Sequence, residues 1–141
     1  MGARRKAREL ALQMLYEYDV SGTEPQEMFQ RSDDLQAAPE GIRDFTRRLV
    51  SGTLTHRKDL DEIISRQADH WRLARMPVVD RNILRLALFE LLHEPETPRP
   101  VVIDEALEIA KRFSTPKSSQ FINGILDGVL KGRRGEAPGG A

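Results

Sequence analysis

The chain has 141 residues, with 22 Lys and Arg balanced by 22 Asp and Glu, no Cys and 39% hydrophobic residues. This length and composition suit one globular domain with its own core, and the lack of cysteine excludes disulfide frameworks, Cys-based zinc sites and thiol enzymes. No apolar run approaches the roughly 20 residues that a membrane span needs, and no apolar segment of the kind found in secretory signals follows the N-terminal charges, so we expect a cytoplasmic protein.

The zero net charge hides an alternation of charged blocks. Residues 1–16 carry a net charge of +3, residues 17–40 of −6 and residues 111–141 of +4. Both ends of the chain are therefore basic. If the fold brings these ends together, they form one positive patch on a neutral protein.

The first predicted helix follows the basic start of the chain. Its apolar residues recur at the spacing of an amphipathic helix: Ala7, Leu10, Ala11, Met14, Leu15 and Tyr18. A Ser-Gly pair at residues 21–22 ends this helix. Thr23 and Gln26 form the T-x-x-Q pattern of a capping box, with Pro25 in the first turn, and predict a short second helix. We expect residues 31–38 to form an acidic loop.

Helical spacing continues through the rest of the chain. Pro39 opens a third predicted helix, which a fourth follows closely. Pro77 opens a fifth that is apolar around most of its circumference, so it should be the most buried. A sixth and a seventh helix follow, separated by Pro116, and Gly132 is the expected C-cap of the last. No segment has the alternation of a strand, so we predict an all-α fold of about seven helices, with residues 133–141 as a disordered tail.

The sequence offers little for catalysis. His56, His70 and His93 lie far apart, and none has a second metal ligand at i+4 spacing. Asp104 and Glu108 share a helix face, but acids near a first helical turn are explained by the helix dipole. No glycine-rich phosphate loop or nucleophile elbow occurs. We therefore expect no enzyme, no metal and no cofactor.

The basic cluster at the start of the chain invites a binding function. Arg4, Arg5, Lys6 and Arg8 lie in a first helical turn, at the positive end of its dipole, so helix stability does not explain them. A phosphate backbone would explain them, because each neutralised phosphate releases counterions. A frayed and solvated terminus is the alternative, and charge alone supports both equally.

A second candidate set lies near the junction of the sixth and seventh predicted helices. Lys111, Arg112 and Lys117 supply positive charge there. Ser118 and the neighbouring Ser, Thr and Gln residues supply neutral donors suited to phosphates or base edges.

Three segments in order along the chain carry a resemblance. They are ARRKARELALQMLY at residues 3–16, VDRNILRLALFEL at 79–91, and VIDEALEIAKRF with SSQFINGILD within 102–127. Together they resemble the NusB family of bacterial transcription antitermination factors. The resemblance implies two packed helical subdomains in a single RNA-binding domain over residues 1–132. It also implies a job without catalysis, in which boxA-type single-stranded RNA is bound together with NusE, a small-subunit ribosomal protein. That pair joins the antitermination complex on RNA polymerase during ribosomal RNA transcription.

The resemblance also assigns roles to residues. It implies RNA binding by five residues: Arg4, Arg5, Lys6, Arg8 and Tyr16. It implies contact with NusE at Asp80, and it places Phe121 near both ligands, where we expect contact with NusE. The charges and hydroxyl donors of the second candidate set, rather than the resemblance, make Lys111, Lys117 and Ser118 candidates for RNA binding. At Lys117 this chain departs from the family, where an acidic residue is common, and we expect Lys117 to raise RNA affinity because it attracts phosphate.

Other interpretations stay open from the residues alone. Tyr16 fits a half-buried packing role as well as a ligand role, and Phe121 begins an apolar stripe typical of a core. Asp80 is also explained by its place near a helix N-terminus. NusB-like domains also occur fused to ribosomal RNA methyltransferases, so the chain could belong to an RNA-modification system. A helical interaction module without RNA contact is the third interpretation.

Overall fold

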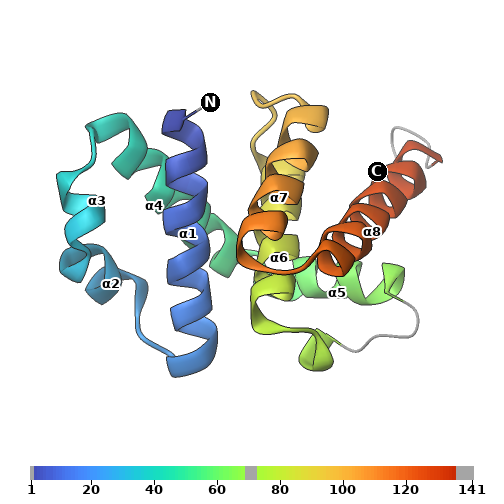
Figure 1. The fold of residues 1–141 in the computed structure, drawn as a ribbon, viewed down its shortest axis with the longest axis horizontal. Helices are drawn as coiled ribbons and strands as arrows, with labels where there is room; N and C mark the ends of the chain where they lie inside the picture. The colour runs from blue at the N-terminus through green and yellow to red at the C-terminus, as the bar shows by residue number, and fades with distance from the viewer. Residues whose placement is uncertain (1, 69–72, 136–141) are drawn as a thin grey trace.

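A computed structural model of the chain describes residues 2–68 and 73–135, with side chains described as far as residue 132. Within these residues all regular structure is helical, which confirms the predicted all-α fold (Figure 1). The α-helices are α1 Gly2–Ser21, α2 Pro25–Arg31, α3 Asp33–Ala37, α4 Glu40–Thr55, α5 Arg57–Gln67, α6 Val78–His93, α7 Arg99–Phe113 and α8 Pro116–Gly135; a 3-10 helix spans Leu73–Arg75. No helix in the described part of the chain is both long and apolar enough to cross a membrane.

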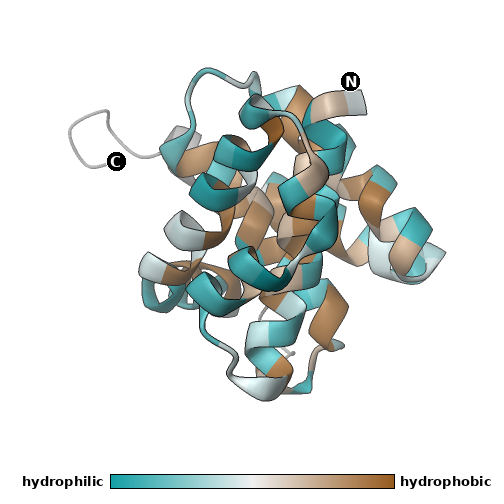
Figure 2. Ribbon diagram, turned by 90° about the vertical axis from the view of Figure 1, so that its left-hand side faces the viewer, coloured by the Kyte–Doolittle hydropathy of each residue, from teal (hydrophilic) through white to brown (hydrophobic). Residues whose placement is uncertain are grey.

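The helices form two groups that share one core. Helices α1 to α4 lie together on one side of the molecule, and α5 to α8 lie on the other (Figure 1). Helix α6 packs against helices of both groups, so the two subdomains are joined by a continuous cluster of buried residues. Hydrophobic segments face this shared interior while hydrophilic segments face outward (Figure 2).

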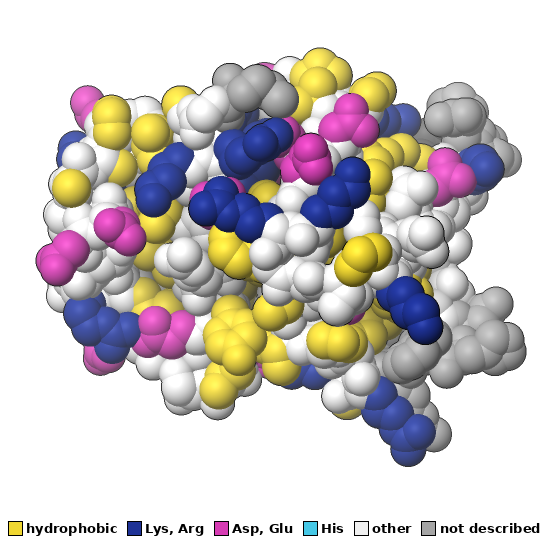
Figure 3. Space-filling view, in the orientation of Figure 1, with side chains coloured by type: hydrophobic (Ala, Val, Ile, Leu, Met, Phe, Trp, Pro, Cys, Tyr) yellow, Lys and Arg dark blue, Asp and Glu magenta, His cyan; other side chains and the backbone are white. Residues whose placement is uncertain are grey.

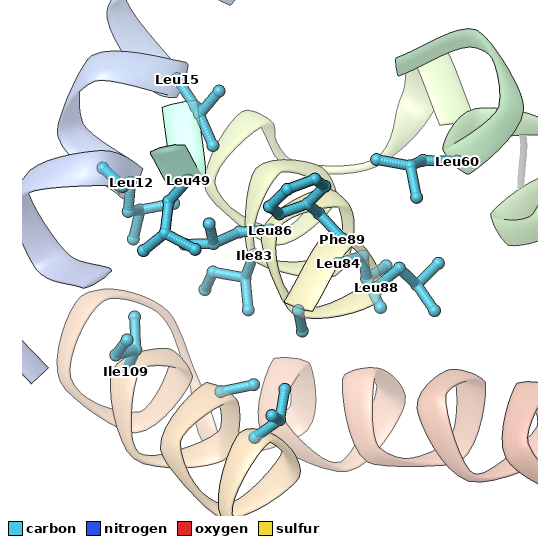
Figure 4. Packing of buried hydrophobic residues seen from close by; sticks show 14 of the residues in the cluster. Leu12, Leu15, Leu49, Leu60, Ile83, Leu84, Leu86, Leu88, Phe89 and Ile109 are labelled. Carbon is cyan, nitrogen blue, oxygen red and sulfur yellow. The ribbon is translucent and has the colours of Figure 1, made fainter. Parts of the chain in front are cut away.

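Helix α6 is the centre of the fold because apolar residues cover nearly its whole circumference. Figure 4 shows its buried side chains surrounded by leucines of α1, α4 and α5 and by Ile109 of α7. Leu84 and Leu88 are fully buried. Burying each such side chain contributes about 1.5–3 kcal/mol. The prediction that this helix is the most buried is confirmed.

The segment between α1 and α4 differs from the sequence prediction. Glu24 is the N-cap of α2 and makes no capping bond with its side chain, while the Thr23 hydroxyl bonds to Ser21, so the predicted capping box is wrong. The predicted acidic loop contains α3. Ser32 caps this helix by accepting a hydrogen bond of 3.1 Å from the Leu35 amide, and Leu35 is buried.

The ends of two helices bear on the remaining predictions. Gly22 has φ +75°, the left-handed conformation that ends α1 as expected. Helix α8 continues three residues beyond Gly132, the predicted C-cap, to Gly135. Residues 136–141 of the expected tail lie outside the described residues, as do His70 and Trp71.

Candidate functional site

Basic residues of α1 and α7 lie on one face of the molecule. Lys and Arg side chains gather across the upper middle of the view in Figure 3, where α1 and α7 run next to each other in Figure 1. Residues spaced at i, i+4 and i+11 on α1 turn toward α7. We call this region the α1–α7 seam, and it consists of Arg5, Glu9 and Tyr16 on α1 with Glu105, Arg112 and Phe113 on α7.

Two ion pairs join α1 to α7 along the α1–α7 seam. Arg5 donates from Nε to Glu105 Oε1 at 3.0 Å and from Nη2 to Oε2 at 2.6 Å. Arg112 donates to Glu9 at 2.9 Å. The hydrogen bond from Arg5 is the main cause that lowers the pKa of Glu105, and the same bond raises the pKa of Arg5. Arg5 is therefore held in place, yet its side chain is still 37% exposed.

Arg8 lies in the interior although the sequence places it in the RNA-contacting cluster. Its side chain is 4% exposed and forms a bidentate pair with Glu90 of α6, at 2.7 and 2.8 Å. Nη1 lies 3.6 Å from Glu105 Oε1. In this conformation the Arg8 guanidinium is not available to a ligand. It ties α1 to α6 and α7.

The other two cations of the cluster are exposed. The guanidinium of Arg4 lies 4.2 Å from the centroid of the Phe45 ring and bonds to Thr97 at 3.3 Å. Lys6 is exposed and makes no ion pair within the described residues. The basic start thus contains one buried residue that links helices, Arg8, and three residues that are accessible to a ligand: Arg4, Arg5 and Lys6.

Asp80 is also buried, at 2% exposure, in the first turn of α6. Its carboxylate oxygens accept hydrogen bonds of 2.7 Å from the hydroxyls of Ser114 and Ser118. The Ser118 amide in turn donates to the Thr115 hydroxyl at 3.0 Å. Asp80 therefore fixes the turn between α7 and α8, and each of its oxygens already accepts one hydrogen bond.

Beside this turn lies a depression of about 340 Å³, which we call the turn groove. Its lining is mostly apolar: Met76, Pro77, Asp80, Lys117, Ser118 and Phe121. Lys117 is exposed and Phe121 is half-buried, so both present surface to the groove. Lys111 of α7 is exposed, and its Nζ lies 3.8 Å from Glu108 Oε2.

A second depression of about 370 Å³ opens at the lower end of the α1–α7 seam, and we call it the tyrosine groove. Tyr16 and Phe113 line it together with Val79 of α6. Tyr16 is 43% exposed and Phe113 is 39% exposed. Tyr16 is therefore partly accessible to a ligand. Each groove has one lining residue in the first turn of α6, Val79 in the tyrosine groove and Asp80 in the turn groove.

A further network of charges joins α1 to the start of α6. Asp19 accepts hydrogen bonds from Arg81, at 2.7 and 2.9 Å, and from Arg85 and Asn82, at 3.0 and 2.9 Å. Burial raises the pKa of Asp19, but these bonds and the charges of Arg81 and Arg85 outweigh burial and bring the pKa to about 2. Arg85 also pairs with Asp61 of α5. This network is structural, since its members are largely buried.

The described histidines do not form a metal site. His56 and His93, far apart in sequence, stack with their ring centroids 4.0 Å apart. No group of three or more His, Cys, Asp or Glu in the described part of the chain is arranged to hold a metal ion.

Sequence reasoning missed the acids that organise the basic cluster. Glu90 is the only polar residue between Leu86 and Leu92, and a carboxylate in such a setting is buried only when it is paired. Arg8 has apolar residues at i+3, i+4 and i+7, which place it beside the buried stripe of α1. These two signals together point to the Arg8–Glu90 pair. Glu105 carries a similar signal, because Val102 at i−3 and Ile109 at i+4 place it on the apolar stripe of its helix.

Comparisons with known proteins agree with this architecture. The model of the NusB family matches residues 5–131. A transcription antitermination protein NusB from Symbiobacterium thermophilum is 44% identical over 143 residues, covering 96% of this chain and 94% of that protein. The solved structure of T. maritima NusB superposes with a TM-score of 0.83 at 38% identity, over 91% of this chain and 90% of that one. A crystal structure of the antitermination factors NusB and NusE in complex with dsRNA superposes with a TM-score of 0.84 at 27% identity, over 94% of this chain and 98% of that one.

Proposed function

The chain belongs to the NusB family, and on this premise we propose that it is a transcription antitermination factor that binds boxA-type RNA together with NusE. In this role it joins the antitermination complex on RNA polymerase during ribosomal RNA transcription. The similarity to a NusB chain solved together with NusE and RNA supports this proposal. The protein acts as one RNA-binding domain over residues 1–132, in the cytoplasm.

The observation that carries the proposal is the cluster of exposed cations on and beside the α1–α7 seam. Arg4, Arg5 and Lys6 lie at the start of α1, and Lys111 and Arg112 lie on α7 beside it. Cations gathered on one face bind a phosphate backbone because they release its counterions. We propose that these residues contact the RNA backbone, while Arg8 supports them from the interior.

Contacts with the phosphate backbone of RNA do not recognise its bases. We propose that the tyrosine groove and the turn groove supply this recognition. Tyr16 presents a ring on which a base can stack, a contact that contributes about 1–3 kcal/mol per base in single-strand recognition. Lys117 stands beside the hydroxyl-bearing turn at Ser118 and attracts phosphate. We propose that the RNA runs from the basic start of α1 along the seam toward Lys117.

The turn groove suits the protein partner. Phe121, Met76 and Pro77 give it an apolar lining, and apolar surface in the centre of a polar rim is typical of protein interfaces. We propose that Phe121 contacts NusE directly. Asp80 contributes to this surface by holding Ser114 and Ser118 in place, since its own oxygens are already bonded.

The proposed role involves no catalytic step. The alternative role in an RNA-modification system requires a nucleotide-type cofactor domain with a glycine-rich turn after a strand. The described residues contain no strand and therefore no such domain. An adaptor that brings RNA and protein together fits the described surfaces better.

The proposal is tested by titrating a boxA-like RNA into the protein, alone and with NusE, at several salt concentrations. We expect tighter binding with NusE and a linear fall of log K with log salt. Replacing Arg4 and Arg5 together by Ala should reduce the slope by about 1.4, at about 0.7 per phosphate for single strands. Arg66→Ala is the matched control, because Arg66 is exposed on α5 and pairs only with Glu62 within the described residues. Binding without salt dependence, or no binding, would refute the RNA-binding role.

A further inference from the structure

We propose that Glu105 is a positioning residue for RNA binding, which it supports by holding the Arg5 guanidinium ready for a phosphate; this inference rests on the proposed function. Glu105 is a buried acid beneath a face that we expect to bind a polyanion. On charge alone it is unfavourable there, because it repels phosphate. Its contacts indicate why an acid at this place can nevertheless strengthen binding.

The geometry leaves the outer edge of Arg5 free. A guanidinium carries five N–H donors in a rigid plane. Glu105 takes two of them, one on Nε and one on Nη2, through its two oxygens. The other three donors have no acceptor among the described residues, and the side chain is 37% exposed. Arg5 is thus fixed on its inner side and open on its outer side.

Fixing the side chain before binding lowers the entropic cost of binding. Immobilising a long side chain at an interface costs about 0.5–1.5 kcal/mol, so a side chain that is already held avoids a factor of about 2 to 12 in affinity. The bidentate geometry also sets the plane of the guanidinium, which decides whether two parallel bonds to a phosphate can form. Glu105 is itself anchored, since it is buried and lies 3.6 Å from Arg8.

Arg5 differs in this respect from its neighbours in the cluster. The Arg8 guanidinium donates to Glu90 and its side chain is 4% exposed, so it is held in place but is not accessible to a ligand. Lys6 is exposed without an ion pair in the described residues, so it is open but not fixed. Arg5 combines an anchor with exposure, which makes the anchor relevant to binding.

Charge and positioning predict opposite signs for Glu105→Gln. The substitution removes one negative charge from beside the RNA and one of the two acceptors that hold Arg5. If charge alone mattered, RNA affinity would rise. If Glu105 positions Arg5, we expect affinity to fall about two- to tenfold and the salt slope to move toward that of Arg5→Ala.

The control is Asp104→Asn, on the preceding residue of α7. Asp104 is exposed and makes no side-chain hydrogen bond within the described residues, so this change removes the same charge without touching Arg5. We expect its RNA affinity to be equal to or slightly higher than that of the wild type. Far-UV circular dichroism and NusE binding, measured on each variant, establish that the folded protein is compared.

A double-mutant cycle separates positioning from a general effect on the fold. Glu105→Gln is measured again in an Arg5→Ala background, where no guanidinium remains to be held. The proposal expects no further loss of RNA affinity there. An equal loss in both backgrounds would overturn it, as would unchanged or higher affinity of the single Glu105→Gln variant. If the wild type itself shows no salt-dependent binding, the proposed function fails; if it binds and Arg5→Ala weakens it, only the role of Glu105 is at issue.

Discussion

Replacing Arg8 by Met should destabilise the protein strongly, because the buried Glu90 loses its partner. Met keeps much of the length and the apolar stem of the side chain but removes the guanidinium. The Glu90 carboxylate, now without its bidentate partner, stays buried among the leucines of α6. Glu105 also loses the neighbouring charge at 3.6 Å.

The magnitude follows from burial. Exposed ion pairs contribute about 0–1 kcal/mol, whereas removing one partner of a buried pair costs about 3–5 kcal/mol because an uncompensated charge remains. Both side chains of the Arg8–Glu90 pair are at most 4% exposed, so the larger figure applies. At roughly 4 °C per kcal/mol, the melting temperature should fall by about 12–20 °C.

The assay is urea unfolding at neutral pH, followed by circular dichroism, for Arg8→Met, Glu90→Met and the double variant. The double variant should be more stable than either single variant, since it leaves neither charge of the pair buried alone. A loss of stability below about 1 kcal/mol in Arg8→Met would refute the assignment of Arg8 as a buried structural residue.

Two further predictions concern pH and the turn groove. The pKa of Asp19 is about 2 against an ordinary value of 3.8, so its charge stabilises the fold above about pH 4 and this contribution is lost as the pH falls through 2. In acid unfolding, the difference in stability between the wild type and Asp19→Asn should therefore become smaller over that range. A constant difference would contradict the prediction. Lys117→Asp should weaken RNA binding and reduce its salt slope, because an attractive charge beside the groove becomes a repulsive one; equal affinity would remove Lys117 from the interface.

The helices with strong local signals were predictable from the sequence. Helix α6 is apolar around most of its circumference, and burial on all sides follows from that pattern alone. The Ser-Gly pair that ends α1 likewise carries its own signal, and Gly22 adopts the expected left-handed conformation. Helix α3 was missed because its five residues are too few to show a helical period.

The roles of charged residues were harder to predict, because they depend on partners distant in sequence. Arg8 meets Glu90 across 82 positions, and Asp80 meets Ser114 and Ser118 across 34 and 38. A sequence shows where a charge lies on its own helix but not which carboxylate or hydroxyl the fold brings to it. Spacing on α1 sets Arg8 beside the buried stripe and so separates it from the exposed cations of the cluster, but it does not show that Glu105 would hold Arg5.

The measurement that tests the account most directly is amide chemical-shift mapping of the protein during titration with boxA-like RNA. The account predicts the largest changes at residues 4–6, around Tyr16, and over residues 111–118, all on the face that carries the α1–α7 seam. Changes concentrated on α2 and α3, with the seam unaffected, would contradict it.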